Sequence, residues 1–310
     1  MRLLACVISA ALFFVASFAI DGSATASAYG PGHRVDVGGR RIYVNCTGSG
    51  SPTVILESGA GSFSVDWALV QPEIARTNRV CSYDRANAGW SDPAPAWDEP
   101  EQTARDLHTA LALDGQHAPY TLVGQSMGGL FVRWFQHEYP NEVKGLILID
   151  SYETTAPYRG KQVPLYSLTK EELQSTLRPP SSLHKPPLPA TVQAPFDKLP
   201  PQQAAEHLEL QRQFFTAIDF NKGPAMMESW REAFLILHNE SEKPDSLRDL
   251  PLAILTRDGA SPEEMEIQRS YLQLSSRSEA TVVKGSGHFI QIERPEDVIA
   301  AIRRVCAESR

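Results

Sequence analysis

Five residues, Gly124-Gln125-Ser126-Met127-Gly128, have the Gly-x-Ser-x-Gly spacing that can turn a serine hydroxyl into a nucleophile. An apolar stretch precedes them and an amphipathic stretch follows, so we predict a short strand, a very tight turn and then a helix. The two glycines let strand and helix approach closely, and they leave Ser126 on a strained backbone with its hydroxyl exposed. The backbone N–H of Met127 would then point at the group that the hydroxyl attacks.

Serine chemistry also needs a base within hydrogen-bonding reach and an acid that orients this base. Among the eight histidines of the sequence, His288 stands apart because it follows the last predicted strand inside a glycine-rich turn, Gly285-Ser-Gly-His-Phe289. An imidazole in such a turn can reach over the edge of a sheet. The other histidines fall on predicted helices, before the first strand or in the region after residue 150, where surface or packing roles are expected.

A run of small residues, Ser58-Gly59-Ala60-Gly61, follows a short apolar strand predicted over residues 53–57. In this position a backbone N–H can point at the oxyanion that forms during attack on a carbonyl. We assign this second donor to Ala60, with Gly59 as the alternative, and a plain flexible loop is the non-catalytic interpretation. Asp84 and Arg85, in a polar turn after the next strand, are expected to hold that turn by hydrogen bonds and charge pairing.

Apolar strands alternate with helices along most of the chain, which predicts a largely parallel sheet covered by helices on both faces. The first two strands form a hairpin around Gly38-Gly39. The predicted strands cover residues 33–37, 40–46, 53–57, 79–83, the apolar residues that lead into the serine turn, 143–149, 252–256 and 280–284. The predicted helices cover residues 67–75, 103–113, the stretch from the serine turn to Tyr139, 262–275 and 295–306.

The region from residue 152 to residue 250 differs in character from the rest. It is rich in proline and has two good helix candidates, residues 201–217 and 225–238, but no convincing strand pattern. Structureless loops of this length are rare in compact domains. We therefore predict a helical cap that gates substrate access, inserted into a core made of residues 29–151 and 251–310.

The first 28 residues carry the features of a secretory signal peptide. Arg2 gives a positive start, residues 3–20 are apolar, and Ala26-Ser-Ala28 offers a small-residue cleavage site. A retained N-terminal anchor is the competing interpretation, because the apolar stretch is long for a signal peptide. We predict a secreted or periplasmic protein with no stable membrane insertion after cleavage.

Charge and composition limit the partners. The formal net charge of -8 and the pI of about 5.5 argue against nucleic acid, because no basic surface would neutralise phosphates. A chain of 310 residues, 42% of them hydrophobic, suits one sizeable domain with an insertion. After removal of the signal peptide Cys46, Cys81 and Cys306 remain, which allows one disulfide in an oxidising compartment, and their spacing does not suggest a metal site.

These features together resemble the α/β-hydrolase superfamily over nearly the whole chain that follows the signal peptide. Residues 124–129 resemble its nucleophile elbow, residues 84–91 its Asp-x-Arg-Gly-x-Gly-x-Ser turn, and residues 287–289 its histidine loop. Ser58-Gly59-Ala60 stands where the family has His-Gly-x, with serine in place of the histidine. The resemblance implies an α/β fold with a mostly parallel eight-stranded sheet, helices on both faces and an inserted helical cap.

The resemblance leaves two candidates for the acid. Most members carry it after the strand that here covers residues 252–256, which points to Asp258, but the usual Gly-x-x-Asp spacing is absent there. Some members, certain dehalogenases among them, carry it one strand earlier, which points to Asp150. We favour Asp150 and keep Asp258 as the alternative. The strand order of the family also sets the second and fourth strands side by side, which implies a possible disulfide between Cys46 and Cys81.

The chemistry implied by the resemblance is acyl transfer without a metal or an organic cofactor. Ser126 attacks a carbonyl, His288 moves the proton, and the N–H groups of Met127 and Ala60 hold the oxyanion. A serine nucleophile disfavours dehalogenase and epoxide-hydrolase chemistry, because those relatives use aspartate. Gly-x-Ser-Met-Gly-Gly is the form of many esterases and lipases, so a small-molecule carboxylic ester is the expected substrate. A proline-iminopeptidase-like aminopeptidase and a non-catalytic ligand-binding protein on the same fold are the alternatives.

Overall fold

The computed structural model describes residues 30–97, 99–151, 155–177, 185, 187–243 and 246–309, so the predicted signal peptide lies outside the described residues. Within these ranges eight strands form one sheet in the order β1-β2-β4-β3-β5-β6-β9-β10. β2 runs antiparallel to both of its neighbours, and the other neighbouring pairs are parallel. The strands are β1 (His33–Asp36), β2 (Arg41–Thr47), β3 (Thr53–Glu57), β4 (Val80–Tyr83), β5 (Tyr120–Gln125), β6 (Val143–Ile149), β9 (Leu252–Arg257) and β10 (Ser278–Val283).

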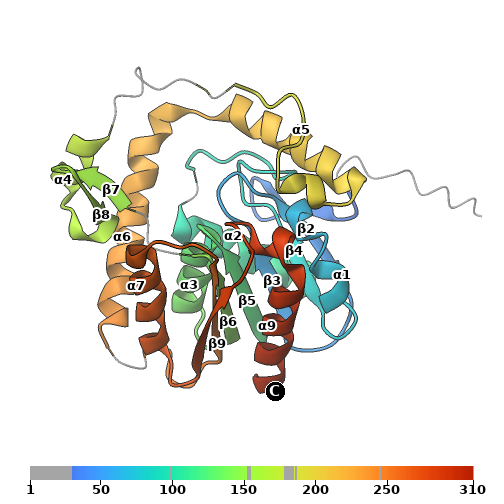
Figure 1. Cartoon of the computed structure of the whole chain (residues 1–310). Coiled ribbons are helices and arrows are strands. Elements are labelled where there is room, and N and C mark those ends of the chain that lie inside the picture. The colour runs from blue at the N-terminus through green and yellow to red at the C-terminus, as the bar shows by residue number, and fades with distance from the viewer. Residues whose placement is uncertain are drawn as a thin grey trace, which may run out of the picture.

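Helices cover both faces of the sheet (Figure 1), because successive strand side chains point to opposite sides. On β6, Leu146 and Leu148 pack in one cluster with α2 (Pro100–Leu113) and α3 (Gly128–Glu138). Ile147 and Ile149 pack in the opposite cluster with α1 (Gln71–Ile74) and α9 (Pro295–Glu308). All four side chains are fully buried. A continuous apolar run of this kind is what a central parallel strand requires, and the predicted α/β sheet is confirmed.

The helix predicted over residues 67–75 is wrong in its extent. The chain forms a 3-10 turn, Ser64–Trp67, and then only the short helix α1, with Pro72 in its first turn. Proline has no N–H to donate and its ring clashes with the carbonyl four residues earlier, so a continuous helix cannot run through this position. The helix predicted over residues 262–275 likewise divides into α7 (Pro262–Ser270) and a 3-10 turn, Tyr271–Leu274.

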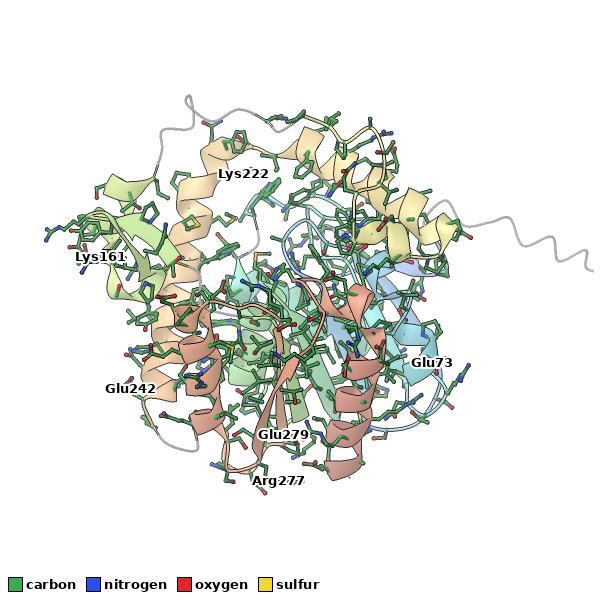
Figure 2. All side chains as sticks on the ribbon, in the orientation of Figure 1. Glu73, Lys161, Lys222, Glu242, Arg277 and Glu279 are labelled. Carbon is green, nitrogen blue, oxygen red and sulfur yellow. A yellow bond between two sulfur atoms is a disulfide. The ribbon has the colours of Figure 1, made fainter. Side chains whose placement is uncertain are left out.

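The described residues between 155 and 243 form an insertion between β6 and β9, which we call the β6–β9 insertion. It contains β7 (Thr155–Tyr158), β8 (Lys161–Pro164), α4 (Lys170–Thr176), α5 (Pro201–Ala217) and α6 (Gly223–Ser241). Figure 1 shows α6 running along one side of the sheet and α5 crossing above it. Lys222 and Glu242 mark the two ends of α6 (Figure 2). The helix predicted over residues 201–217 is confirmed at both ends, and the helix predicted over residues 225–238 is longer than expected.

The expectation that the β6–β9 insertion contains no strand is wrong. β7 and β8 pair as an antiparallel hairpin, and the two turn residues, Arg159 and Gly160, have φ values of 51° and 78°. Glycine suits the second position of such a turn. Pro157 and Pro164 concealed the strands, because proline is rare inside sheets. A two-stranded hairpin tolerates proline, since each strand pairs along one edge only.

Cys46 of β2 and Cys81 of β4 lie opposite each other in the antiparallel register and form a disulfide, as the resemblance implied. Cys306 is buried on α9. In the part of the chain that the structure describes, no helix combines the length and the apolar character needed to cross a membrane.

Candidate active site

Ser126 occupies the tight turn between β5 and α3. Its φ is 52°, in the left-handed region that residues with a side chain rarely adopt. The turn is held in place by a hydrogen bond of 2.8 Å from the N–H of Ser126 to the carbonyl of Ile149 at the end of β6. The strand, the strained serine and the helix therefore follow one another as the sequence predicted.

The glycines around Ser126 are required by close backbone contacts. A Cβ on Gly124 would lie 2.6 Å from the carbonyl oxygen of Gly128, and a Cβ on Gly128 would lie 2.7 Å from the carbonyl oxygen of Glu57 on β3. Such distances leave no room for a side chain. Because α3 starts here, the N–H of Met127 belongs to the N-terminal donors that no carbonyl of the helix satisfies.

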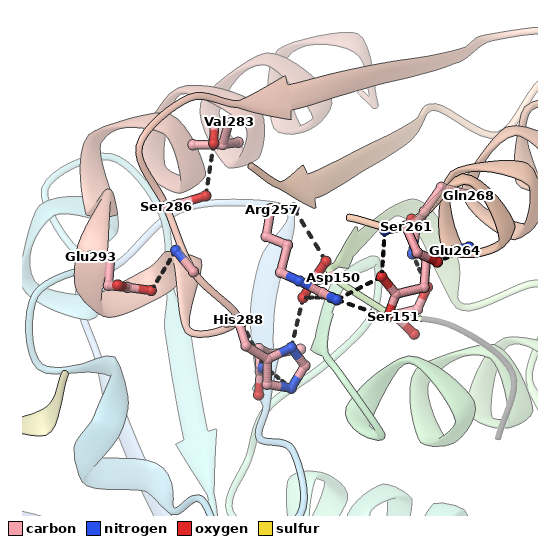
Figure 3. A network of polar contacts seen from close by, with 12 residues as sticks. Asp150, Ser151, Arg257, Ser261, Glu264, Gln268, Val283, Ser286, His288 and Glu293 are labelled. Carbon is pink, nitrogen blue, oxygen red and sulfur yellow. Dashed lines mark hydrogen bonds and ion pairs between the residues drawn. The ribbon is translucent and has the colours of Figure 1, made fainter. Parts of the chain in front are cut away.

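His288 lies in the loop after β10 and contacts Asp150 at the end of β6 (Figure 3). The distance from His288 Nδ1 to Asp150 Oδ2 is 2.6 Å. The carboxylate is fully buried, whereas about a third of the imidazole is exposed. A carboxylate on Nδ1 holds the proton on that nitrogen and leaves Nε2 as the acceptor, which is the tautomer a general base needs.

Asp150 stays ionised in this buried position because several N–H groups donate to it. Burial would raise the pKa of the carboxyl, but hydrogen bonds from His288 and from the backbone and side chain of Arg257 outweigh this effect and hold the pKa below its ordinary value. The alternative acid, Asp258, is not at the histidine. Its carboxylate accepts hydrogen bonds from Lys284 Nζ at 3.2 Å and from the N–H of Gly285 at 3.0 Å.

Gln125, the residue before Ser126, connects the serine turn to the histidine loop. It is fully buried, and its Nε2 donates to the carbonyl of His288 at 3.1 Å and lies 3.4 Å from His288 Nε2. The imidazole is thereby held beside the serine turn. Neither composition nor spacing singled out this residue, since the middle positions of Gly-x-Ser-x-Gly are variable in the pattern.

The loop with the predicted second oxyanion donor passes directly over Ser126. A Cβ on Gly59 would lie 3.1 Å from Ser126 Cβ and would overlap the side-chain oxygen of Gln125. The carbonyls of Ser58 and Gly59 both accept hydrogen bonds from Arg85, at 2.6 and 3.2 Å, which fixes the loop. This arrangement leaves the following residue, Ala60, at the wall of the same cavity as Ser126.

Arg85 and Asp84 have the structural roles expected of them. Arg85 forms a buried ion pair with Glu57, which also accepts a hydrogen bond from Tyr83. Asp84 accepts from the backbone N–H groups of Ser64 and Trp90, and its burial raises its pKa to about 6. Ser58, which stands where the family has histidine, accepts from Trp67 Nε1 at 2.9 Å and donates to the carbonyl of Phe63, so it anchors the loop.

A cavity of about 830 Å³ opens above Ser126. Ala60 and Met127 contribute to its wall on the core side. The β7–β8 hairpin, α6, and α7 with its N-cap supply the rest, namely Thr155, Lys161, Gln162, Trp230, Ser261, Glu263, Glu264 and Ile267. A concave space of this size, with mixed apolar and polar walls, is typical of a small-molecule site. Among the described residues, no group of three His, Cys, Asp or Glu side chains is arranged to hold a metal ion.

Comparison with known proteins agrees with the observed fold. A family model for the alpha/beta hydrolase fold matches residues 52–170. An AB hydrolase superfamily protein from Gibberella zeae is 21% identical over 82% of this chain and 86% of its own length. The chain has the α/β-hydrolase fold. It spans less than half of the length of other curated relatives, such as 45% of the uncharacterized protein YbdG from Bacillus subtilis, to which it is 27% identical over 46% of this chain.

Solved α/β-hydrolase structures share the fold at low sequence identity. The epoxide hydrolase CorEH superposes with a TM-score of 0.66 at 17% identity, covering 90% of this chain and 99% of that protein. Est816, an N-acyl homoserine lactone degrading enzyme, superposes with a TM-score of 0.62 at 18% identity, covering 88% of this chain and 99% of that protein. At these identities the likeness shows the fold alone.

Arg257 is a second site residue, after Gln125, that sequence reasoning missed. It ends β9 and contacts Asp150 through both its backbone and its guanidinium. The signal available was indirect. The usual acid spacing is broken after this strand, and a basic residue precedes Asp258 there.

Proposed function

We propose that this α/β-hydrolase is a serine hydrolase that cleaves carboxylic esters of small molecules through an acyl-enzyme intermediate. The observation that supports this most is the 2.6 Å contact from His288 Nδ1 to the buried carboxylate of Asp150, beside the strained serine turn. In this proposal Ser126 is the nucleophile, His288 is the general base and acid, and Asp150 is the acid that orients it.

The reaction proceeds in two halves. Ser126 Oγ attacks the ester carbonyl carbon while His288 Nε2 takes its proton, and the carbonyl oxygen becomes an oxyanion held by the N–H groups of Met127 and Ala60. The bond to the alcohol then breaks, and the imidazolium returns the proton to the departing oxygen. Water attacks the acyl-serine ester by the same route and releases the carboxylic acid and free Ser126.

The nature of the nucleophile favours carbonyl substrates over epoxides. A serine that opened an epoxide would form an alkyl ether. Water does not cleave an ether near neutral pH, so the enzyme would not turn over. A serine that attacks a carbonyl forms an ester, which the same histidine can hydrolyse. This distinction matters because the fold is shared with an epoxide hydrolase.

We also propose that the β6–β9 insertion is a cap that selects the substrate. It contributes Thr155, Lys161, Gln162 and Trp230 to the cavity above Ser126. These side chains come from β7, β8 and α6, so they lie opposite the catalytic residues of the core. A cap in this position would exclude water and shape the acyl and alcohol subsites.

Labelling with a fluorophosphonate tests the nucleophile. Wild-type protein should react covalently, Ser126→Ala should not, and Ser175→Ala, which alters an exposed serine on α4, should react as the wild type does. A wild type that is not labelled would favour a non-catalytic ligand-binding role. A panel of p-nitrophenyl esters measured beside proline β-naphthylamide then separates an esterase from an aminopeptidase.

Export is part of the proposal. The disulfide between Cys46 and Cys81 is the kind of bond that persists in an oxidising compartment. The full chain, expressed in a secreting host, should appear outside the cytoplasm with Tyr29 as its first residue. N-terminal sequencing that finds residues 1–28 still attached would support the anchor instead.

A further inference from the structure

Four charged or titratable side chains form one continuous chain of contacts at the carboxyl ends of β6 and β9 (Figure 3). His288 contacts Asp150, Asp150 contacts Arg257, and Arg257 contacts Glu264 near the start of α7. Glu264 also lines the cavity above Ser126. This series of contacts therefore connects the imidazole, through the buried Asp150, to the wall of the cavity.

Both oxygens of Asp150 accept hydrogen bonds, and His288 and Arg257 share one of them. Oδ2 accepts from His288 Nδ1 at 2.6 Å and from Arg257 Nη1 at 2.9 Å, and Oδ1 accepts from the backbone N–H of Arg257 at 3.1 Å. The imidazole and the guanidinium meet the same oxygen atom, so they lie within two hydrogen-bond lengths of each other. This carboxylate cannot rotate without losing several bonds at once.

Arg257 is itself held by a second carboxylate. Its Nη2 donates to both oxygens of Glu264, at 2.7 and 2.6 Å. Glu264 in turn accepts from the N–H of Ser261 at 2.8 Å in the capping box of α7. The guanidinium thus lies between two anions, and Asp150 is the one that accepts from the histidine at 2.6 Å.

We propose that Arg257 is a positioning residue of the catalytic triad, which shares Asp150 with His288 and sets the pH range in which His288 acts as a base. Glu264 moderates this effect by neutralising the far side of the guanidinium. The inference rests on the proposed serine hydrolase function. A full positive charge next to Asp150 opposes protonation of the imidazole, and removal of Glu264 would strengthen that opposition.

Other charged groups near His288 belong to separate contacts. Glu293 on α8 (Ile290–Glu293) accepts from the N–H of Gly287 at 2.8 Å. Asp258 and Lys284 pair with each other at 3.2 Å at the exposed ends of β9 and β10. Lys284 is a suitable control position. It is a cation in the same region of the molecule, and its ion pair is with Asp258 and not with Asp150.

The test is the second-order rate of inactivation by a fluorophosphonate as a function of pH, which needs no knowledge of the natural ester. The rate should rise with pH as His288 loses its proton. For Arg257→Gln the pH at half-maximal rate should move up by about one unit, because a cation close to the imidazole is lost. For Glu264→Gln it should move down by a smaller amount, and glutamine preserves the capping box of α7.

Two further variants separate charge from shape. Arg257→Lys keeps the positive charge but lacks the planar guanidinium that donates to two carboxylates at once. Its pH midpoint should therefore stay near that of the wild type while the plateau rate falls. Lys284→Gln should leave both midpoint and plateau unchanged. Opposite displacements in Arg257→Gln and Glu264→Gln support the inference, since a purely structural role would lower the rates without moving the midpoints in opposite directions.

The results distinguish a failure of the positioning role of Arg257 from a failure of the proposed hydrolase function. If the wild type is labelled through Ser126 but Glu264→Gln has the wild-type midpoint, the positioning role of this pair is overturned while the hydrolase function stands. The positioning role is overturned in the same way if Arg257→Gln folds and its midpoint does not move. If Arg257→Gln does not fold, Glu264→Gln and Arg257→Lys decide the question. If the wild type is not labelled at Ser126, both proposals fall.

Discussion

Replacement of Asp150 by asparagine should disable the site while keeping its shape. The carboxylate accepts from the backbone N–H of Arg257 on Oδ1, and from Arg257 Nη1 and His288 Nδ1 on Oδ2. Asparagine has one oxygen and one NH2, so in either orientation its NH2 faces N–H groups. When it faces His288, the imidazole must accept at Nδ1 and carry its proton on Nε2. Such a tautomer cannot take the proton of Ser126.

The expected loss is large, and it has a matched control. A wrong tautomer lowers kcat/KM for a p-nitrophenyl ester by about three to four powers of ten, or about 4–5.5 kcal/mol of transition-state stabilisation. Asp258→Asn removes the competing acid, whose side chain is 41% exposed and paired with Lys284. It should change kcat/KM by less than about twofold and leave the thermal unfolding midpoint close to that of the wild type.

Initial rates and thermal unfolding of both variants would decide between the two acids. Asp150 is not the catalytic acid if Asp258→Asn loses activity while Asp150→Asn retains most of it. If Asp150→Asn folds normally and keeps more than about a tenth of wild-type activity, the tautomer of His288 does not control the reaction.

Three further perturbations test other parts of the structure. The Cys46–Cys81 disulfide closes a loop of 35 residues, so replacing both by serine should lower the free energy of unfolding in urea by about 3–4 kcal/mol, and a loss below about 1 kcal/mol would contradict a role in stability. A Cβ on Gly59 would lie 3.1 Å from Ser126 Cβ and displace the oxyanion loop, so Gly59→Ala should lower kcat/KM about 10- to 100-fold, whereas Gly223→Ala, with open space around it, should not. The pKa of Asp84 is raised from 3.8 to about 6 in the folded protein, so its contribution to stability is present below about pH 4 and is lost as the pH rises through about 6. Relative to Asp84→Asn, the wild type should therefore lose up to about 3 kcal/mol of unfolding free energy between about pH 4 and pH 7, and parallel stability curves would contradict this.

The amino-acid sequence alone determined the features that depend on neighbouring residues. The strand, the serine turn and the helix around Ser126 follow from glycine spacing and from apolar patterns within about 20 residues. The start of α5 follows from the prolines at residues 200 and 201. The α/β class follows from the alternation of apolar strands with helices.

Two local features were missed for local reasons. The prolines of β7 and β8 argued against strands, although a hairpin with free outer edges accepts them. Pro72 interrupts the helix predicted over residues 67–75, and its effect was outweighed by the apolar residues around it.

Only the tertiary structure decided which groups meet. Asp150 and Asp258 both follow core strands, and nothing in the order of residues states which carboxylate reaches the histidine. The answer depends on how β6, β9 and β10 align in the sheet, since that alignment brings the end of β6 to the loop after β10. The contacts of Gln125 with His288 and of Arg257 with Asp150 span 163 and 107 residues, and such distant pairs carry no local signal in a single sequence.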